Sequence, residues 1–284
     1  MSGAGNDFII FDARKSELPN KSNLLDNNYK SASSLSSDQI QKISNRKNIG
    51  SDQLLILKTP PSPASSDCVM EIYNSDGSVS GACGNATRCV ASILIEESGK
   101  SEVKIQTLYG ILKCWKSSEN LISVDMGKPE FFWEKIPLAK EIDAQKVLLH
   151  GFEFSCANFG NPHAVTFINE SLDEKRFFEI GPKVENDSIF PQKTNVEFAK
   201  ILSDDLIEVR VWERGVGETL ACGSGACAVA VLAIKNGLVK SNKITTRFKG
   251  GDLVIEWSEV NSSVTMTGGY QKIFTGVIDE KFFE

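Results

Sequence analysis

The chain has 284 residues, enough for two domains that each bury a hydrophobic core. Hydrophobic residues make up 41% of it and charged residues 24%, a composition typical of globular proteins and not of disordered ones. The net charge of −6 argues against a broad basic surface, so we expect a small molecule or another protein as partner, with no nucleic acid and no membrane.

No apolar run approaches the roughly 20 residues that a membrane-spanning helix needs, and the first residues lack the basic flank and apolar stretch of a signal peptide. We therefore expect a cytoplasmic protein. Seven cysteines without a Cys-x-x-Cys pair indicate neither a disulfide framework nor a usual zinc site. The only histidines are His150 and His163, so acid–base chemistry is expected to rest largely on Cys, Asp, Glu or Lys.

The first half of the chain predicts strands around one apolar helix. Alternating segments rich in β-branched and aromatic residues are expected to be strands, and an apolar segment is expected to be a helix buried on most sides. Stretches rich in Ser, Asn or Pro are expected to be loops. In chain order we expect a loop at Asn20–Ser37, a helix from Ser37 to about Asn45, a loop at Thr59–Ser66, a strand at Asp67–Tyr73, a helix after Cys83, a strand at Val103–Cys114 and another at Leu121–Met126.

The second half repeats the first, because residues 74–91 resemble residues 213–230 at an offset of 222 − 83 = 139. Two homologous halves are therefore expected to meet near Gly127. The fold predicted is α+β, with two pseudo-symmetric domains that each wrap a curved, mostly antiparallel sheet around a central helix. The repeated elements are a strand at Leu206–Trp212, a helix after Cys222 that ends at Asn236-Gly237, and strands at Ile244–Phe248 and Leu253–Trp257.

Cys83 and Cys222 occupy the same position in the two halves, where a strand turns into a helix. The N–H groups of a first helical turn favour a thiolate over a thiol, so both sulfurs are candidates for chemistry. A single cysteine in apolar surroundings is more often inert packing, which we expect for the other five. A duplicated pair, each member followed by glycine and then by Asn85 or Ser224, favours a functional role.

Two helix starts that carry thiols and converge on one cleft would suit a small carboxylate. The N–H groups would bind the carboxylate, and the sulfurs would lie on opposite faces of the adjacent α-carbon. One thiolate would remove the α-proton and the opposite thiol would return another, which inverts the stereocentre without a cofactor. A redox pair would not need duplicated anion-binding helices, and a cysteine nucleophile would have only His163 as its base.

Six segments together resemble the diaminopimelate epimerase family, in the expected order and over essentially the whole chain. The last of them is highly specific. The segments are Gly5-Asn-Asp-Phe8, Asn74-Ser-Asp-Gly77, Ala82-Cys-Gly-Asn-Ala-Thr-Arg88, Gly160-Asn-Pro-His163, Phe190-Pro-Gln-Lys-Thr-Asn195 and Glu213-Arg-Gly-Val-Gly-Glu-Thr-Leu-Ala-Cys-Gly-Ser-Gly-Ala-Cys227.

The resemblance implies a pyridoxal-phosphate-independent enzyme that interconverts LL- and meso-2,6-diaminopimelate on the route to lysine and peptidoglycan. It implies no cofactor and no metal, and leaves open whether the chain forms a homodimer. It also implies that the C-terminal segment returns to the first domain. The domains expected are residues 1–127 plus 271–284, carrying Cys83, and residues 128–270, carrying Cys222.

Carried onto this sequence, the resemblance makes Cys83 and Cys222 the acid–base pair. His163 and Glu213 match polar groups beside the thiols, and Arg214 is suited to a bidentate contact with the distal carboxylate. An asparagine in a turn or an isolated Glu–Arg pair is more often structural, so only the joint placement favours the functional reading. The positions implied to bind substrate are Asn6, Gln53, Asn74, Gly84, Asn85, Asn161, Asn195, Glu213, Arg214, Gly223 and Ser224.

Two alternatives stay open at this point. One is another cofactor-independent racemase of the same fold, acting for example on histidine or proline, which would not need a site for a distal carboxylate and ammonium. Arg214 with Asn74 and Asn195 favours the epimerase. The other is a fold relative that no longer epimerises, which the presence of both Cys83 and Cys222 argues against.

Overall fold

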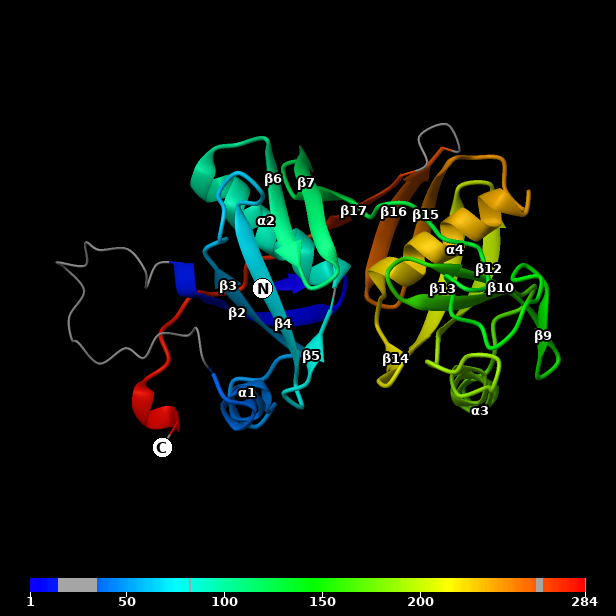
Figure 1. The fold of residues 1–284 in the computed structure, drawn as a ribbon, viewed down its shortest axis with the longest axis horizontal. Helices are drawn as coiled ribbons and strands as arrows, with labels where there is room; N and C mark the ends of the chain where they lie inside the picture. Colours follow the sequence, from blue (N-terminus) through cyan, green and yellow to red (C-terminus); the bar gives the residue numbers. More distant parts are fainter. Residues whose placement is uncertain (15–34, 82, 259–262, 284) are drawn as a thin grey trace. The chain divides into compact units, whose positions relative to one another are not determined.

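The computed structural model describes residues 1–14, 35–81, 83–258 and 263–283, so most of the loop expected at Asn20–Ser37 lies outside the described residues (Figure 1). The chain divides into two compact units, Met1–Ile122 with Tyr270–Glu284, and Ser123–Gly269. The first division falls earlier than the sequence indicates, because the segment before Lys128 joins the second unit. Met126 donates its N–H to Val264, and Gly127 accepts from the N–H of the same residue.

The first unit places one long helix against a mixed sheet. Strand β2 runs parallel to β3, β3 and β4 are antiparallel, β4 runs parallel to β6, and β6 forms a hairpin with β7. The elements are β1 (Ser2–Gly3), β2 (Asn6–Asp12), α1 (Ser37–Ser44), β3 (Gln53–Lys58), β4 (Cys68–Asn74), β5 (Val79–Ser80), α2 (Gly84–Ser98), β6 (Glu102–Thr107), β7 (Gly110–Ser118) and, near the C-terminus, a 3-10 turn, η3 (Glu280–Phe283). Strand β8 (Leu121–Asp125) begins in the first unit and continues into the second from Ser123.

The second unit has the same order of elements and the same pairings. Strand β11 runs parallel to β12, β12 and β13 are antiparallel, β13 runs parallel to β15, and β15 forms a hairpin with β16. The elements are β9 (Val147–Leu149), β10 (Phe152–Asn158), β11 (Pro162–Phe167), α3 (Glu174–Glu185), β12 (Asn195–Ser203), β13 (Leu206–Glu213), β14 (Gly217–Thr219), α4 (Gly223–Lys235), β15 (Lys243–Phe248), β16 (Gly251–Trp257) and β17 (Val264–Gly269).

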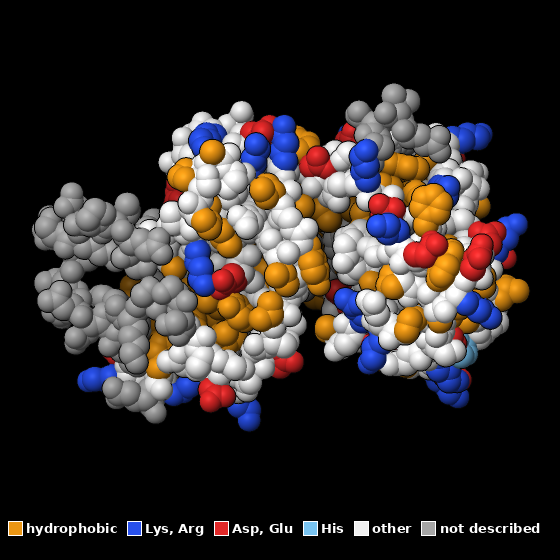
Figure 2. All heavy atoms as spheres, in the orientation of Figure 1, with side chains coloured by type: hydrophobic (Ala, Val, Ile, Leu, Met, Phe, Trp, Pro, Cys, Tyr) orange, Lys and Arg blue, Asp and Glu red, His pale blue; other side chains and the backbone are white. Residues whose placement is uncertain are grey.

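The predicted α+β fold is confirmed. Figure 1 shows α2 and α4 each lying against the strands of its own unit. Ten of the thirteen residues of α4 are buried, including its whole middle from Gly225 to Ala233, as its uniformly apolar sequence predicts. Figure 2 shows acidic and basic side chains interspersed on the drawn face of each unit. In the part of the chain that the structure describes, no helix has the length and apolar character needed to cross a membrane.

Two features of the fold depart from the predicted elements. The segment Val103–Cys114 belongs to two strands, because the chain turns at Leu108-Tyr109 and returns as β7. Helix α3 is not predicted by the patterns above. Its N-cap is Asp173, whose side chain accepts a hydrogen bond from the N–H of Arg176 at 2.7 Å. One face of α3 contributes Phe177 to the core of the second unit.

Phe177 is expected to be a main support of the second unit. Its ring is fully buried, with its centroid 5.4 Å from that of Phe198 and with the guanidinium of Arg210 3.8 Å from the ring centre. Phe177→Ala leaves a cavity and should lower the free energy of unfolding by about 3–5 kcal/mol in a denaturant titration. Phe132→Ala, at a ring that is 72% exposed, is the matched control and should cost about 0.5 kcal/mol or less. Equal losses in the two variants would contradict this packing.

Candidate active site

In the first unit, Cys83 is the N-cap of α2. Its backbone is extended, with φ −152° and ψ 108°, and its sulfur accepts a hydrogen bond from the N–H of Ala86 at 3.5 Å. The hydroxyl of Thr87 donates to the carbonyl of Cys83 at 2.9 Å. The half-buried thiol is thus held at the positive end of the helix, next to the N–H groups of Gly84 and Asn85.

A chain of side-chain amides extends from this helix start to the beginning of β2. Asn85 donates its Nδ2–H to Oδ1 of Asn6 at 2.6 Å, and its own Oδ1 accepts from Nη2 of Arg88 at 2.9 Å. Arg88 is fully buried, which is exceptional for a guanidinium. Arg88 therefore fixes which way the Asn85 amide faces, and Asn85 in turn orients Asn6.

Gln53 and Asn74 are direct neighbours at the same end of the sheet. They face each other in the register of β3 and β4, and Nε2 of Gln53 donates to Oδ1 of Asn74 at 3.0 Å. Because β2 and β3 start at Asn6 and Gln53 and antiparallel β4 ends at Asn74, the three amides lie at one edge of the sheet. The structure thus brings the predicted residues of this unit together.

The second unit repeats this geometry around Cys222, the N-cap of α4. Its φ is −125° and ψ 119°, and its sulfur accepts from the N–H of Gly225 at 3.4 Å. The hydroxyl of Ser224 lies 3.5 Å from the same sulfur. The Cys222 residue is only 6% exposed and is the more enclosed of the two thiols.

Asn195 ties together the strand ends around this helix start. Its Nδ2 donates to the carbonyl of Pro162 at 2.8 Å, and its Oδ1 accepts from the N–H of Arg214 at 3.0 Å. The guanidinium of Arg214 donates to the carbonyl of Gln192 at 3.2 Å. Asn195 therefore holds the backbone of Arg214 in place, and Arg214 stays half-buried with further donors available to a ligand.

A buried histidine–glutamate pair distinguishes this unit from the first. His163 and Glu197 are both fully buried, with Nδ1 and Oε1 2.7 Å apart, and Nε2 of His163 lies 3.0 Å from Oδ1 of Asn161. Glu213 accepts a short hydrogen bond from the hydroxyl of Thr219. Glu197, Thr219 and Arg88 are not among the site residues predicted from the sequence. A charged residue between Val196 and Phe198 in an apolar strand was the available signal for Glu197.

The surroundings of Cys222 act on its pKa in two opposite directions. Burial, followed by the charges of Glu213 and Glu197, raises the pKa of the Cys222 thiol well above its usual range, although Ser224 and the N–H of Gly225 act in the opposite direction. Burial likewise raises the pKa of Glu213, against hydrogen bonds from Thr219 and Cys222. Burial and the two carboxyl groups thus act against the N–H donors of the helix start, which favour a thiolate.

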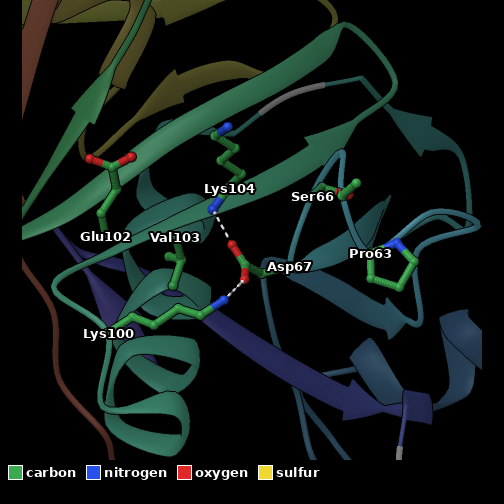
Figure 3. A pocket seen from close by; sticks show the side chains of 8 residues that line it. Pro63, Ser66, Asp67, Lys100, Glu102, Val103 and Lys104 are labelled. Carbon is green, nitrogen blue, oxygen red and sulfur yellow. Dashed lines mark hydrogen bonds and ion pairs between the residues drawn. The ribbon is translucent and has the colours of Figure 1, made fainter.

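A surface pocket of the first unit lies away from the predicted residues (Figure 3). Its volume is about 250 Å³. The Asp67 carboxylate in this pocket is already paired, since it accepts hydrogen bonds from Nζ of Lys100 at 2.5 Å and from the N–H of Lys104 at 2.7 Å. The lining residues are Pro63, Ala64, Ser66, Asp67, Lys100, Glu102, Val103 and Lys104.

The pKa of Cys222 can be tested by alkylation. Only the thiolate reacts, so a raised pKa moves the midpoint of the rate-against-pH curve for iodoacetamide to a higher pH than in the unfolded chain. Glu213→Gln removes a nearby negative charge and should return the midpoint toward lower pH. Rates are read from the Cys222 peptide by mass spectrometry. A wild-type midpoint at or below that of the unfolded chain would contradict the account.

Comparison with known proteins identifies the family of this chain. The diaminopimelate epimerase family matches residues 1–132 and 155–273. A diaminopimelate epimerase of Rhodospirillum centenum is 40% identical over 284 residues, covering 99% of this chain and 91% of that protein. A second, from Pelagibacter ubique, is 41% identical over 272 residues, covering 92% of this chain and 91% of that protein.

Solved structures share the fold at much lower identity. A "Predicted Epimerase" of Pseudomonas aeruginosa has a TM-score of 0.60 at 15% identity, covering 93% of this chain and 90% of its own. A hydroxyproline epimerase of Agrobacterium vitis has a TM-score of 0.56 at 15% identity, covering 82% and 78%. The structural matches establish the fold alone, whereas the sequence matches over nearly the full length show that the chain belongs to the diaminopimelate epimerase family.

Proposed function

We propose that the chain is an isomerase that interconverts LL- and meso-2,6-diaminopimelate, in lysine and peptidoglycan precursor synthesis, with Cys83 and Cys222 as its two bases. The observation that carries the proposal is the duplicated N-cap: in each unit a cysteine caps the equivalent helix, in a member of this family. The proposed enzyme acts in the cytoplasm on a small molecule. Sedimentation velocity, which gives the mass of the particle in solution, tests whether it forms a homodimer.

In the proposed reaction, the two thiols act on opposite faces of one α-carbon. A thiolate takes the α-proton, the bonding electrons move toward the carboxylate, and the other thiol donates its proton to the opposite face. No electrons are gained or lost overall, and the two cysteines exchange protonation states. The raised pKa of Cys222 suits it to hold a proton until the carbanion forms.

The remaining residues have binding roles in this proposal. N–H groups at the two helix starts stabilise the reacting carboxylate as negative charge develops on it. The amides of Asn6, Gln53, Asn74, Asn161 and Asn195 supply directional contacts at the edges of the sheets, and Glu213 and His163 act beside Cys222. Arg214 binds the distal carboxylate, a group that proline and histidine lack. An amino-acid panel that includes diaminopimelate separates these substrates.

Arg214→Lys tests the assignment of the distal carboxylate. Lysine keeps the charge but not the planar pair of donors, so KM for diaminopimelate should rise about 10-fold to 100-fold. Arg247→Lys is the matched control, because Arg247 pairs with Asp252 on the exposed hairpin of β15 and β16. Steady-state kinetics of both variants give the answer. Unchanged KM in Arg214→Lys would contradict this role for Arg214.

Isotope labelling tests the use of two bases. In heavy water, early product should carry deuterium at the inverted centre while remaining substrate stays largely unlabelled, because the incoming proton comes from the cysteine that has exchanged with solvent. Mass spectrometry of the two stereoisomers gives both amounts. Equal early labelling of substrate and product would indicate a single base.

Cys83→Ala and Cys222→Ala should each stop epimerisation, since either change removes the acid for one direction and the base for the other. Cys227→Ala, at a fully buried cysteine in the middle of α4, controls for the general effect of losing a thiol and should retain turnover. Turnover near that of the wild type in either of the first two variants would contradict the mechanism.

A further inference from the structure

Glu197 is a buried carboxylate to which the proposed reaction assigns no contact with the substrate. Its side chain is fully buried on β12, and Oε2 has no hydrogen-bond partner among the described residues. An unsatisfied buried carboxylate oxygen destabilises a fold, so its presence calls for a functional explanation. Among the described residues, the partner of its carboxylate is His163.

His163 lies between Glu197 and Asn161 and contacts both side chains. Nδ1 of the imidazole faces a carboxylate oxygen at 2.7 Å, and Nε2 faces the amide oxygen of Asn161 at 3.0 Å. Both facing atoms are oxygens, so with the amide in this orientation the ring would have to donate from both nitrogens. Asn161 then keeps its Nδ2–H groups for a ligand. If the ring lost the hydrogen on Nε2, the amide would turn over and present its oxygen instead.

The first unit lacks these groups at the equivalent positions. Phe8 pairs with Gln53 as His163 pairs with Asn195, so Phe8 corresponds to His163, and by the same register Leu55 corresponds to Glu197. The starts of α2 and α4 also differ, in a way that leaves room for Glu197 only in the second unit. A Cβ added to Gly225 would lie 2.7 Å from Oε1 of Glu197, whereas Ala86 occupies the corresponding site of α2.

We propose that Glu197 is a positioning residue, whose carboxylate keeps the His163 imidazole donating from both nitrogens and thereby holds the Asn161 amide with its N–H groups toward the substrate. The inference rests on the proposed function, in which Asn161 contacts diaminopimelate. Glu197 itself touches neither substrate nor reacting atoms in this account. Its substitution by glutamine keeps the shape of the side chain and removes the charge that balances the doubly hydrogen-bonded ring.

The first measurement is ¹⁵N NMR of protein labelled at histidine. The chain has two histidines, so His150→Gln leaves His163 as the only source of histidine signals. This substitution should be tolerated, because His150 pairs with Asp187 at a partly exposed site. In the wild type both ring nitrogens of His163 should carry hydrogens, and in Glu197→Gln one of the two should be lost. A single ring hydrogen in the wild type overturns the proposal, even if Glu197→Gln fails to fold.

The second measurement is the kinetics of diaminopimelate epimerisation. Glu197→Gln should raise KM about tenfold, as expected for one lost charge-assisted contact, and by a larger factor than it lowers kcat. Glu208→Gln, on the neighbouring strand β13 with a hydrogen bond from Ser171, is the matched control and should leave KM unchanged. A purely structural role would lower kcat per mole of protein and leave KM as it is, which overturns the proposal.

The two measurements separate this inference from the proposed function. A wild type that does not epimerise diaminopimelate contradicts the proposed function, while the ring hydrogens of His163 still decide whether Glu197 controls the imidazole. An active wild type whose KM does not respond to Glu197→Gln contradicts the inference alone.

Discussion

The hydrogen bond from a first-turn N–H to a cysteine sulfur is the interaction on which the site in each unit depends. It places Cys83 and Cys222 at the positive ends of α2 and α4, where N–H groups are left for a ligand. The geometry needs a strand that delivers an extended cysteine directly to a buried helix. The sheet edges then supply side-chain amides at the same end, because parallel and antiparallel neighbours start and finish there.

Duplication of the fold has not produced two identical environments. The first unit surrounds its cysteine with neutral amides and the buried guanidinium of Arg88, whereas the second buries Glu197 and His163 and places Glu213 beside Cys222. Burial and carboxylates raise the pKa of Cys222. In the proposed reaction, which needs one base and one acid at a time, the two thiols thus start from unequal surroundings.

Much of the fold follows from the sequence because its signals are local. The turn-rich segments before Cys83 and Cys222, the apolar helices after them and their repetition predict two α+β units, which the structure confirms. Other features depend on contacts that a linear pattern does not contain. The alternation around Glu197 indicates only a strand, and its burial becomes visible once His163 on β11 is paired with β12. Helix α3 was not predicted, because its apolar face is defined by packing that a linear pattern does not show. Phe177 of this helix packs against Phe198 and Trp212 of other elements.

The most direct test of the two-thiol account is a crystal structure of the chain with diaminopimelate bound. The account predicts that the sulfurs of Cys83 and Cys222 lie on opposite faces of one α-carbon, each about 3–3.5 Å from it, as a reacting pair requires. Its carboxylate should accept from N–H groups of both helix starts. A complex in which only one sulfur approaches the α-carbon, or both lie on the same face, would contradict the account.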